Sequence, residues 1–78
     1  MNTSETLNWL AGLFEMPAGS ISADTLREEI AAWDSLGVLT LIAALDEEFN
    51  IQLTESEIQQ IRSVKDVLNL LQSKGRIS

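Results

Sequence analysis

Ser35 is the side chain of this sequence best placed for chemistry, because it stands where a polar segment gives way to an apolar run in AAWDSLGVLTLIAALDEEF (31–49). An enzyme site needs a nucleophile with a base, a bound metal, or paired carboxylates in a cleft. The chain contains no histidine and no cysteine, which excludes a Ser–His pair and a thiolate. No segment has the residue spacing of a calcium loop. Catalysis by the chain itself is therefore not predicted.

Ser35 is better suited to accept a chemical group than to attack a substrate unaided. Asp34 is a good N-cap residue for a helix that begins at Ser35. A phosphate on the Ser35 hydroxyl would lie beside unpaired backbone N–H groups and the positive end of the helix dipole. Serine is also favoured at helix starts for structural reasons alone, so the tripeptide DSL does not by itself decide between these two interpretations.

The elements that must position this serine follow from the apolar spacing. Apolar residues recur at helical spacing in three longer segments and one short one, and no segment alternates as a strand does. The predicted helices span about 5–16, 35–50, 55–61 and 64–73, with a loop over 17–33 and a frayed tail over 75–78. We therefore predict one domain over 1–78, an all-α four-helix bundle with three main helices, one short helix and a long ordered first loop.

Helix ends are marked by capping residues and by breakers. Pro17 and Gly19 are expected to end the first helix, and Lys74 with Gly75 the last. Side-chain caps are expected from polar residues just before each apolar run. These are Thr3 or Ser4 for the first helix, Asp34 for the second, Thr54 with Glu57 for the third, and Ser63 with Asp66 for the fourth.

Apolar residues outside the helices indicate how the long loop is held. Ile21, Leu26 and Ile30 are expected to fix it to the core, and Trp33 is expected to anchor its end. The 35–50 helix has so broad an apolar surface that burial on more than one side is predicted. No exposed apolar stripe beyond these core faces is evident, so a monomer is expected.

The composition limits the kinds of partner that this chain can bind. The net charge of −7 has the wrong sign for a surface that neutralises nucleic-acid phosphates, so nucleic-acid binding is excluded. An acidic surface favours partners with basic patches, or serves solubility alone. No apolar run approaches the roughly 18 residues of a membrane-spanning helix. The N-terminal segment lacks the basic region of a secretory signal, so a soluble, cytoplasmic protein without membrane insertion is expected.

The segments DSL, LIAALDEEFNIQL and VKDVLNLL, with ISADTLREEIAAWDSL upstream, together resemble the acyl carrier protein family over nearly the whole chain. The resemblance implies that a phosphopantetheinyl transferase, recognising Asp34 and Leu36, attaches 4′-phosphopantetheine from coenzyme A to Ser35. The thiol of that group then carries acyl chains as thioesters. It also implies that catalysis belongs to acyl-transferring and condensing enzymes, and that the chain is not an enzyme.

The resemblance further implies a partner surface and an acyl pocket. The implied partner surface comprises Val38, Ala43, Asp46, Glu47, Leu53 and Glu55. The implied pocket comprises Leu39, Ile42, Leu45 and Leu68. Gly37 and Thr40 depart from the acids usual in carriers of fatty-acid synthesis, and Gly37 is expected to cost roughly 0.5–1 kcal/mol relative to alanine. Weaker electrostatic steering and a dedicated pathway are therefore expected.

Several alternatives stay open at this point. The cargo of the arm can be a fatty-acid or polyketide-type acyl group, or an aminoacyl or peptidyl group. A cofactor-free helical interaction module with the same fold is the remaining alternative.

Overall fold

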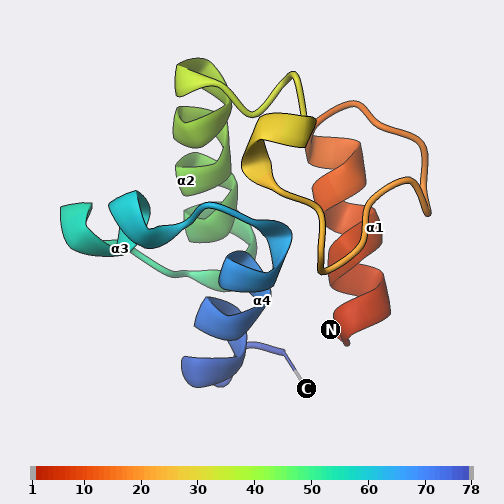
Figure 1. Cartoon of the computed structure of the whole chain (residues 1–78). Coiled ribbons are helices and arrows are strands. Elements are labelled where there is room, and N and C mark those ends of the chain that lie inside the picture. The colour runs from red at the N-terminus through yellow and green to blue at the C-terminus, as the bar shows by residue number, and fades with distance from the viewer. Residues whose placement is uncertain (1, 78) are drawn as a thin grey trace.

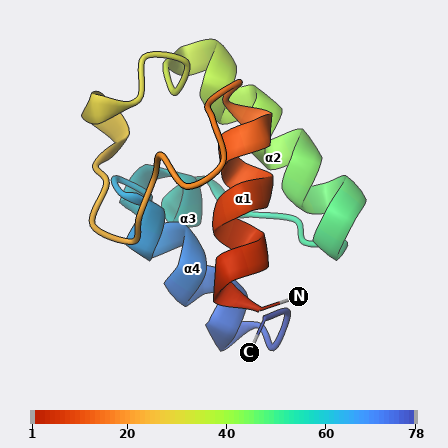
Figure 2. The ribbon, with the colours of Figure 1, turned by 90° about the vertical axis from the view of Figure 1, so that its right-hand side faces the viewer.

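The computed structural model describes residues 2–77, and every regular element in that range is helical (Figure 1). The elements are α1 (Thr3–Leu13), the 3-10 turn η1 (Arg27–Glu29), α2 (Ser35–Phe49), α3 (Glu55–Gln60) and α4 (Val64–Ser73). The all-α bundle of three longer helices and one short helix is thus confirmed. Both ends of the chain lie at the same end of the bundle, where α1 begins and α4 finishes (Figures 1 and 2).

One apolar core joins the three longer helices, the loop and the terminal segment. In Figure 2, α1 lies in front and runs up from its start near α4 to its end beside α2. Burial of apolar area at this core is the main favourable contribution to folding. Its buried members are Leu10, Ala11, Phe14, Ile21, Ile30, Trp33, Leu41, Leu45, Phe49, Ile51, Ile61, Val64, Val67, Leu68, Leu71 and Ile77.

The first helix begins and ends earlier than predicted. Its cap is Asn2, and neither Thr3 nor Ser4: the Asn2 side chain accepts from the Glu5 N–H at 2.8 Å, and the Glu5 carboxylate accepts from the Asn2 N–H at 3.0 Å. This reciprocal pair satisfies two N–H groups at once. The helix ends at Leu13, before Pro17, because Glu15 adopts the left-handed region with φ 57° and turns the chain away.

The loop after α1 is ordered by buried apolar side chains. Ile21, Ile30 and Trp33 are each 5% exposed or less, and the Trp33 ring stacks on Phe14 with centroids 5.1 Å apart. The prediction that Trp33 anchors the loop is therefore confirmed. The prediction for Leu26 is wrong, since its side chain is 42% exposed.

Leu26 instead joins the loop to the start of α4 through its backbone. It forms an isolated antiparallel bridge with Ser63, beside which the Arg27 N–H donates to the Arg62 carbonyl at 2.9 Å. The Arg27 side chain also donates from Nε to the Trp33 carbonyl at 3.1 Å. These bonds hold the segment that leads to α2 against the segment that leads to α4.

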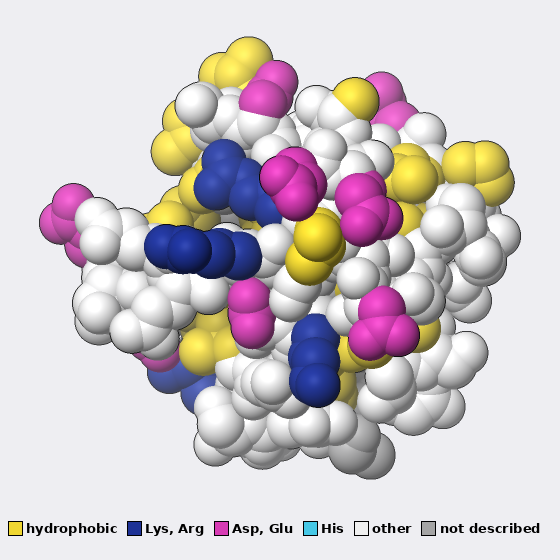
Figure 3. Space-filling model, viewed as in Figure 1, with side chains coloured by type: hydrophobic (Ala, Val, Ile, Leu, Met, Phe, Trp, Pro, Cys, Tyr) yellow, Lys and Arg dark blue, Asp and Glu magenta, His cyan; other side chains and the backbone are white. Residues whose placement is uncertain are grey.

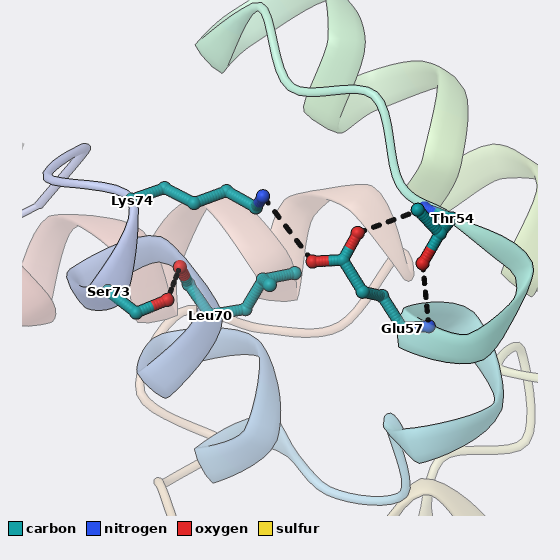
Figure 4. Close-up of polar contacts among 5 residues, drawn as sticks. All are labelled: Thr54, Glu57, Leu70, Ser73 and Lys74. Carbon is teal, nitrogen blue, oxygen red and sulfur yellow. Dashed lines mark hydrogen bonds and ion pairs between the residues drawn. The ribbon is translucent and has the colours of Figure 1, made fainter.

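The short helix α3 is held more loosely. Thr54 and Glu57 form the predicted capping box, but none of the six residues of α3 is buried. Glu57 also pairs with Lys74 of the segment after α4, with Oε2 and Nζ 3.3 Å apart (Figure 4). The Thr54 backbone N–H, and then the Lys74 ammonium, hold the pKa of Glu57 below its ordinary value of 4.5.

The fourth helix begins as predicted, with the Asp66 N–H donating to Ser63 Oγ at 3.2 Å. A capping box would also have the Asp66 carboxylate accept from the Ser63 N–H. Here the Asp66 carboxylate accepts from the Arg62 N–H instead, at 2.9 Å.

The frayed tail predicted over 75–78 is wrong for its described part. Gly75 adopts φ 70°, the Arg76 N–H donates to the Leu71 carbonyl at 2.8 Å, and Ile77 is 8% exposed. The turn returns an apolar side chain to the core, as glycine-ended helices often do. Residue 78 lies outside the described residues.

Candidate functional site

Ser35 is the first residue of α2, and its side chain is exposed. Asp34 is in extended conformation, and its Oδ1 accepts from the Gly37 N–H at 3.0 Å, which confirms the predicted N-cap. Because the Asp34 carboxylate occupies one N–H group of the first turn, it fixes where the helix starts. The Ser35 hydroxyl therefore sits in solvent at the positive end of a 15-residue helix.

The structure shows why position 37 is glycine, which the sequence did not reveal. It is buried, and a Cβ built there would overlap the carbonyl oxygen of Ala32 and stand 3.0 Å from the carbonyl carbon. The loop backbone passes so close to α2 that only glycine fits. The expected helix-propensity cost of Gly37 is thus secondary to this contact. No local pattern signals it, because Ala32 and Gly37 meet through the path of the loop.

The second helix is not buried on more than one side, contrary to prediction. Its buried residues Gly37, Leu41, Leu45 and Phe49 form a single stripe. Leu36 and Leu39 are 74% and 63% exposed. Hydrophobic side chains stand out at the top of the molecule, where α2 begins (Figure 3). A monomer was expected because no exposed apolar stripe was evident. The exposure of Leu36 and Leu39 shows that this reason is wrong.

A small apolar cavity lies between α2, α3 and the loop. Its volume is about 10 Å³, roughly the space of one water molecule. Of the four predicted pocket residues, only Ile42 lines it. Leu39 lies at the surface, and Leu45 and Leu68 lie in the core. The lining of this apolar cavity consists of Trp33, Val38, Leu41, Ile42, Leu53, Ile58 and Ile61.

The structure divides the expected partner-binding residues between two settings. Val38 and Leu53 are half-buried and line the apolar cavity. The other four are exposed along the outer side of α2 and at the start of α3: Ala43, Asp46, Glu47 and Glu55. The acids thus lie away from Ser35, towards the end of α2, while the surface next to Ser35 carries Leu36 and Leu39.

A second, open depression shares Trp33 with the apolar cavity. It measures about 550 Å³ and is lined by Leu26, Arg27, Glu28, Trp33 and Arg62. Sequence reasoning missed it, because Arg27 and Arg62 are brought together only by the Leu26–Ser63 bridge.

Over residues 2–77, no three histidine, cysteine or acidic side chains gather in a way that could hold a metal ion. Within the same range, no helix has the length and apolar character needed to cross a membrane.

These observations define a class of protein: a four-helix bundle that presents one exposed serine from the start of its second helix. The family model described as phosphopantetheine attachment site matches residues 5–71, a range that includes Ser35. An acyl carrier protein of Thermosynechococcus vestitus is 32% identical over 82 aligned positions, covering 95% of this chain and 96% of that protein. The chain belongs to the acyl carrier protein family, and 4′-phosphopantetheine is its prosthetic group.

A shorter sequence match and a solved structure agree with this assignment. An acyl carrier protein of Campylobacter concisus is 37% identical over 49 residues, covering 63% of this chain and 62% of that protein. The solution structure of a holo acyl carrier protein from Geobacter metallireducens superposes with a TM-score of 0.79 at 28% identity, covering 95% of this chain and 86% of that one. The fold is thus shared with this family.

Proposed function

We propose that this chain is a non-catalytic acyl carrier whose Ser35 bears the 4′-phosphopantetheine group. The observation that carries this proposal is the position of the Ser35 hydroxyl, exposed at the first residue of α2 within the segment matched by the phosphopantetheine attachment model. No other exposed serine in the described chain is the first residue of so long a helix.

The residues around Ser35 suit a phosphodiester. The positive end of α2 favours the negative charge of a phosphate on Oγ. A transferase would break the pyrophosphate bond of coenzyme A, join the phosphopantetheinyl phosphorus to Ser35 Oγ, release adenosine 3′,5′-bisphosphate and take up the serine proton. Asp34 holds the helix start in place, and exposed Leu36 offers the transferase an apolar contact. When bound, the group supplies the thiol that a cysteine-free chain lacks.

The apolar cavity gives an acyl chain a place to enter the bundle. It lies below the start of α2, and its outer wall includes Ile58 of α3. Because α3 has no buried residue, moving it outward costs less apolar burial than moving any other helix. We propose that cargo enters between α2 and α3, past Val38 and Ile42.

The surface around Ser35 favours a dedicated pathway. Leu36 and Leu39 are exposed, and the neighbouring positions 37 and 40 carry glycine and threonine. The Thr40 hydroxyl donates to the Leu36 carbonyl at 3.0 Å, so it is turned back on its own helix. Partners would meet apolar side chains next to the arm and acids farther along, at Asp46, Glu47 and Glu55. We further propose that the carrier is cytoplasmic and works with acyl-transferring and condensing enzymes that carry basic patches.

Intact-mass measurement tests the carrier function. The purified chain, incubated with coenzyme A, magnesium and a transferase of broad specificity, should gain the mass of one phosphopantetheinyl group. The Ser35→Ala variant should gain nothing, and Ser20→Ala should behave like the parent chain. A parent chain that stays unmodified would instead support a cofactor-free interaction module.

The pathway is tested by competition with a housekeeping carrier. The loaded chain should react much more slowly with ketosynthase and reductase of general fatty-acid synthesis than their usual carrier does. Equal rates would contradict the dedicated pathway and leave the carrier function intact.

A further inference from the structure

The open depression beside Trp33 differs in chemistry from the apolar cavity next to it. Its lining includes two of the five basic residues of a chain whose net charge is −7, together with the single acid Glu28. Dark blue side chains lie next to one another on this face (Figure 3). Neither Arg27 nor Arg62 forms an ion pair within the described residues. Two arginines at one concave surface favour a carboxylate or phosphate, which guanidinium groups bind through paired hydrogen bonds.

Hydrogen bonds within the chain already fix polar groups that line the depression. Arg27 Nε donates to the Trp33 carbonyl at 3.1 Å, and the Arg27 N–H donates to the Arg62 carbonyl at 2.9 Å. The first bond leaves both terminal nitrogens of the Arg27 guanidinium for a ligand. Because the backbones and one side chain are already fixed, little conformational entropy is lost on binding.

The depression also shares a residue with the segment that leads to Ser35. Trp33, which it shares with the apolar cavity, is two residues from Ser35, a span of at most about 7 Å along the chain. A phosphopantetheine arm is several times longer than this span. An open, hydrated pair of arginines binds free anions weakly, but a group tethered at Ser35 has an effective concentration in the millimolar range. A tethered anion is therefore the ligand that this surface suits.

We propose that Arg27 and Arg62 hold the terminal carboxylate of a dicarboxylic acyl cargo, an inference that rests on attachment of the arm at Ser35. Trp33 then separates two destinations for cargo. An apolar chain enters the cavity lined by Val38 and Ile42, and a carboxylate-ended chain stays in the open depression. Glu28 weakens the second site by repulsion and so limits how long the cargo stays there.

The test compares two cargoes of equal length. Transferase loading from butyryl- and succinyl-coenzyme A yields two forms that differ only in the terminal carboxylate, and intact mass confirms each. The succinyl form should shift the Nε–Hε resonances of Arg27 and Arg62 in ¹⁵N spectra relative to the butyryl form. The shift should vanish in 1 M salt, where the screening length is about 3 Å.

Matched variants assign the effect to the depression. Arg62→Gln should abolish the succinyl-dependent shift at Arg27, whereas Lys65→Gln, the same charge change on an exposed residue outside the depression, should preserve it. Glu28→Gln should enlarge it. Identical spectra for the two loaded forms would overturn the inference while leaving the carrier function standing. Failure of either form to gain mass at Ser35 would overturn the carrier function, and the inference with it.

Discussion

The loop that leads to Ser35 is more firmly anchored than α3, although α3 is regular and the loop is not. Residues 14–34 bury Phe14, Ile21, Ile30 and Trp33, and they bond to the start of α4 through their backbone. None of the six residues of α3 is buried, and the side-chain link from α3 to the segment after α4 is a partly exposed ion pair. Because local opening costs less where fewer apolar side chains are buried, we expect α3 to open more readily than the loop.

This difference matches the two demands of a carrier. The attachment residue needs a fixed position, so that a transferase and later partners find it in one place. The wall of a cargo cavity needs to yield, because a cavity of about 10 Å³ admits no acyl chain as it stands. In the function proposed above, the loop supplies the fixed position of Ser35, and α3 supplies the movable wall of the cavity.

Removing the Trp33 ring should have the largest effect on this comparison. Trp33→Ala deletes a ring that is 3% exposed and stacked on Phe14, so we expect the free energy of unfolding to fall by about 3–5 kcal/mol. Urea denaturation measures it. Trp33→Phe, which keeps an aromatic ring against Phe14, should lose distinctly less. A loss below about 1 kcal/mol for the alanine variant would show that the loop is not anchored there.

Alanine at position 37 should have the next largest effect. The overlap with the Ala32 carbonyl predicts that Gly37→Ala lowers the free energy of unfolding by about 1–3 kcal/mol. Helix propensity alone predicts the opposite sign, a gain of roughly 0.5–1 kcal/mol. Gly12→Ala is the matched control, because its Cβ would meet no atom within 4 Å. Two gains of equal size would refute the close contact.

Breaking the ion pair to Glu57 should have a smaller and more local effect. Lys74→Gln removes the 3.3 Å contact that joins α3 to the segment after α4 (Figure 4). We expect faster hydrogen exchange at the amides of α3 and unchanged exchange at the Arg27 and Trp33 amides. Lys65→Gln should alter neither set. Acceleration in both regions would mean that they open together.

The Thr54 N–H bond to Glu57, together with the Lys74 ion pair, predicts the smallest effect, a pH dependence confined to α3. The pKa of Glu57 is lowered in the folded chain, so its stabilising contribution is present above the ordinary value of 4.5. That contribution disappears as the pH falls through the lower, folded value. The NMR chemical shift of the Glu57 carboxyl carbon should therefore titrate below pH 4.5. The protection of the α3 amides against hydrogen exchange should fall as this carboxylate is protonated. Glu57→Gln should remove that dependence.

Local signals in the sequence were sufficient for much of the fold. The helices were found from apolar spacing, and the caps Asp34, Thr54 and Ser63 were found because each cap is a short-range hydrogen bond. The start of α1 was misplaced by a competing cap at Asn2. Its end was misplaced because no sequence rule places glutamate at a positive φ, as Glu15 is here.

Less of the candidate site could be predicted from the sequence, because more of it depends on tertiary contacts. Ser35 is proposed as the attachment residue because its type, its position and the family resemblance agree. The constraint on Gly37, the exposure of Leu39 and the pairing of Arg27 with Arg62 arise from segments that meet only in the folded chain. The burial of Ile77 was missed for the same reason, since a short tail shows no periodicity.

Trp33 has one practical consequence. Its indole borders both the closed cavity and the open depression, whereas Trp9 packs edge-on against Phe49 with ring centroids 5.2 Å apart. Replacing Trp9 with phenylalanine would leave Trp33 as the single tryptophan, in the lining of both the cavity and the depression. Its emission wavelength and quenching would then report, without any attached dye, which of the two proposed cargo sites a tethered acyl group occupies.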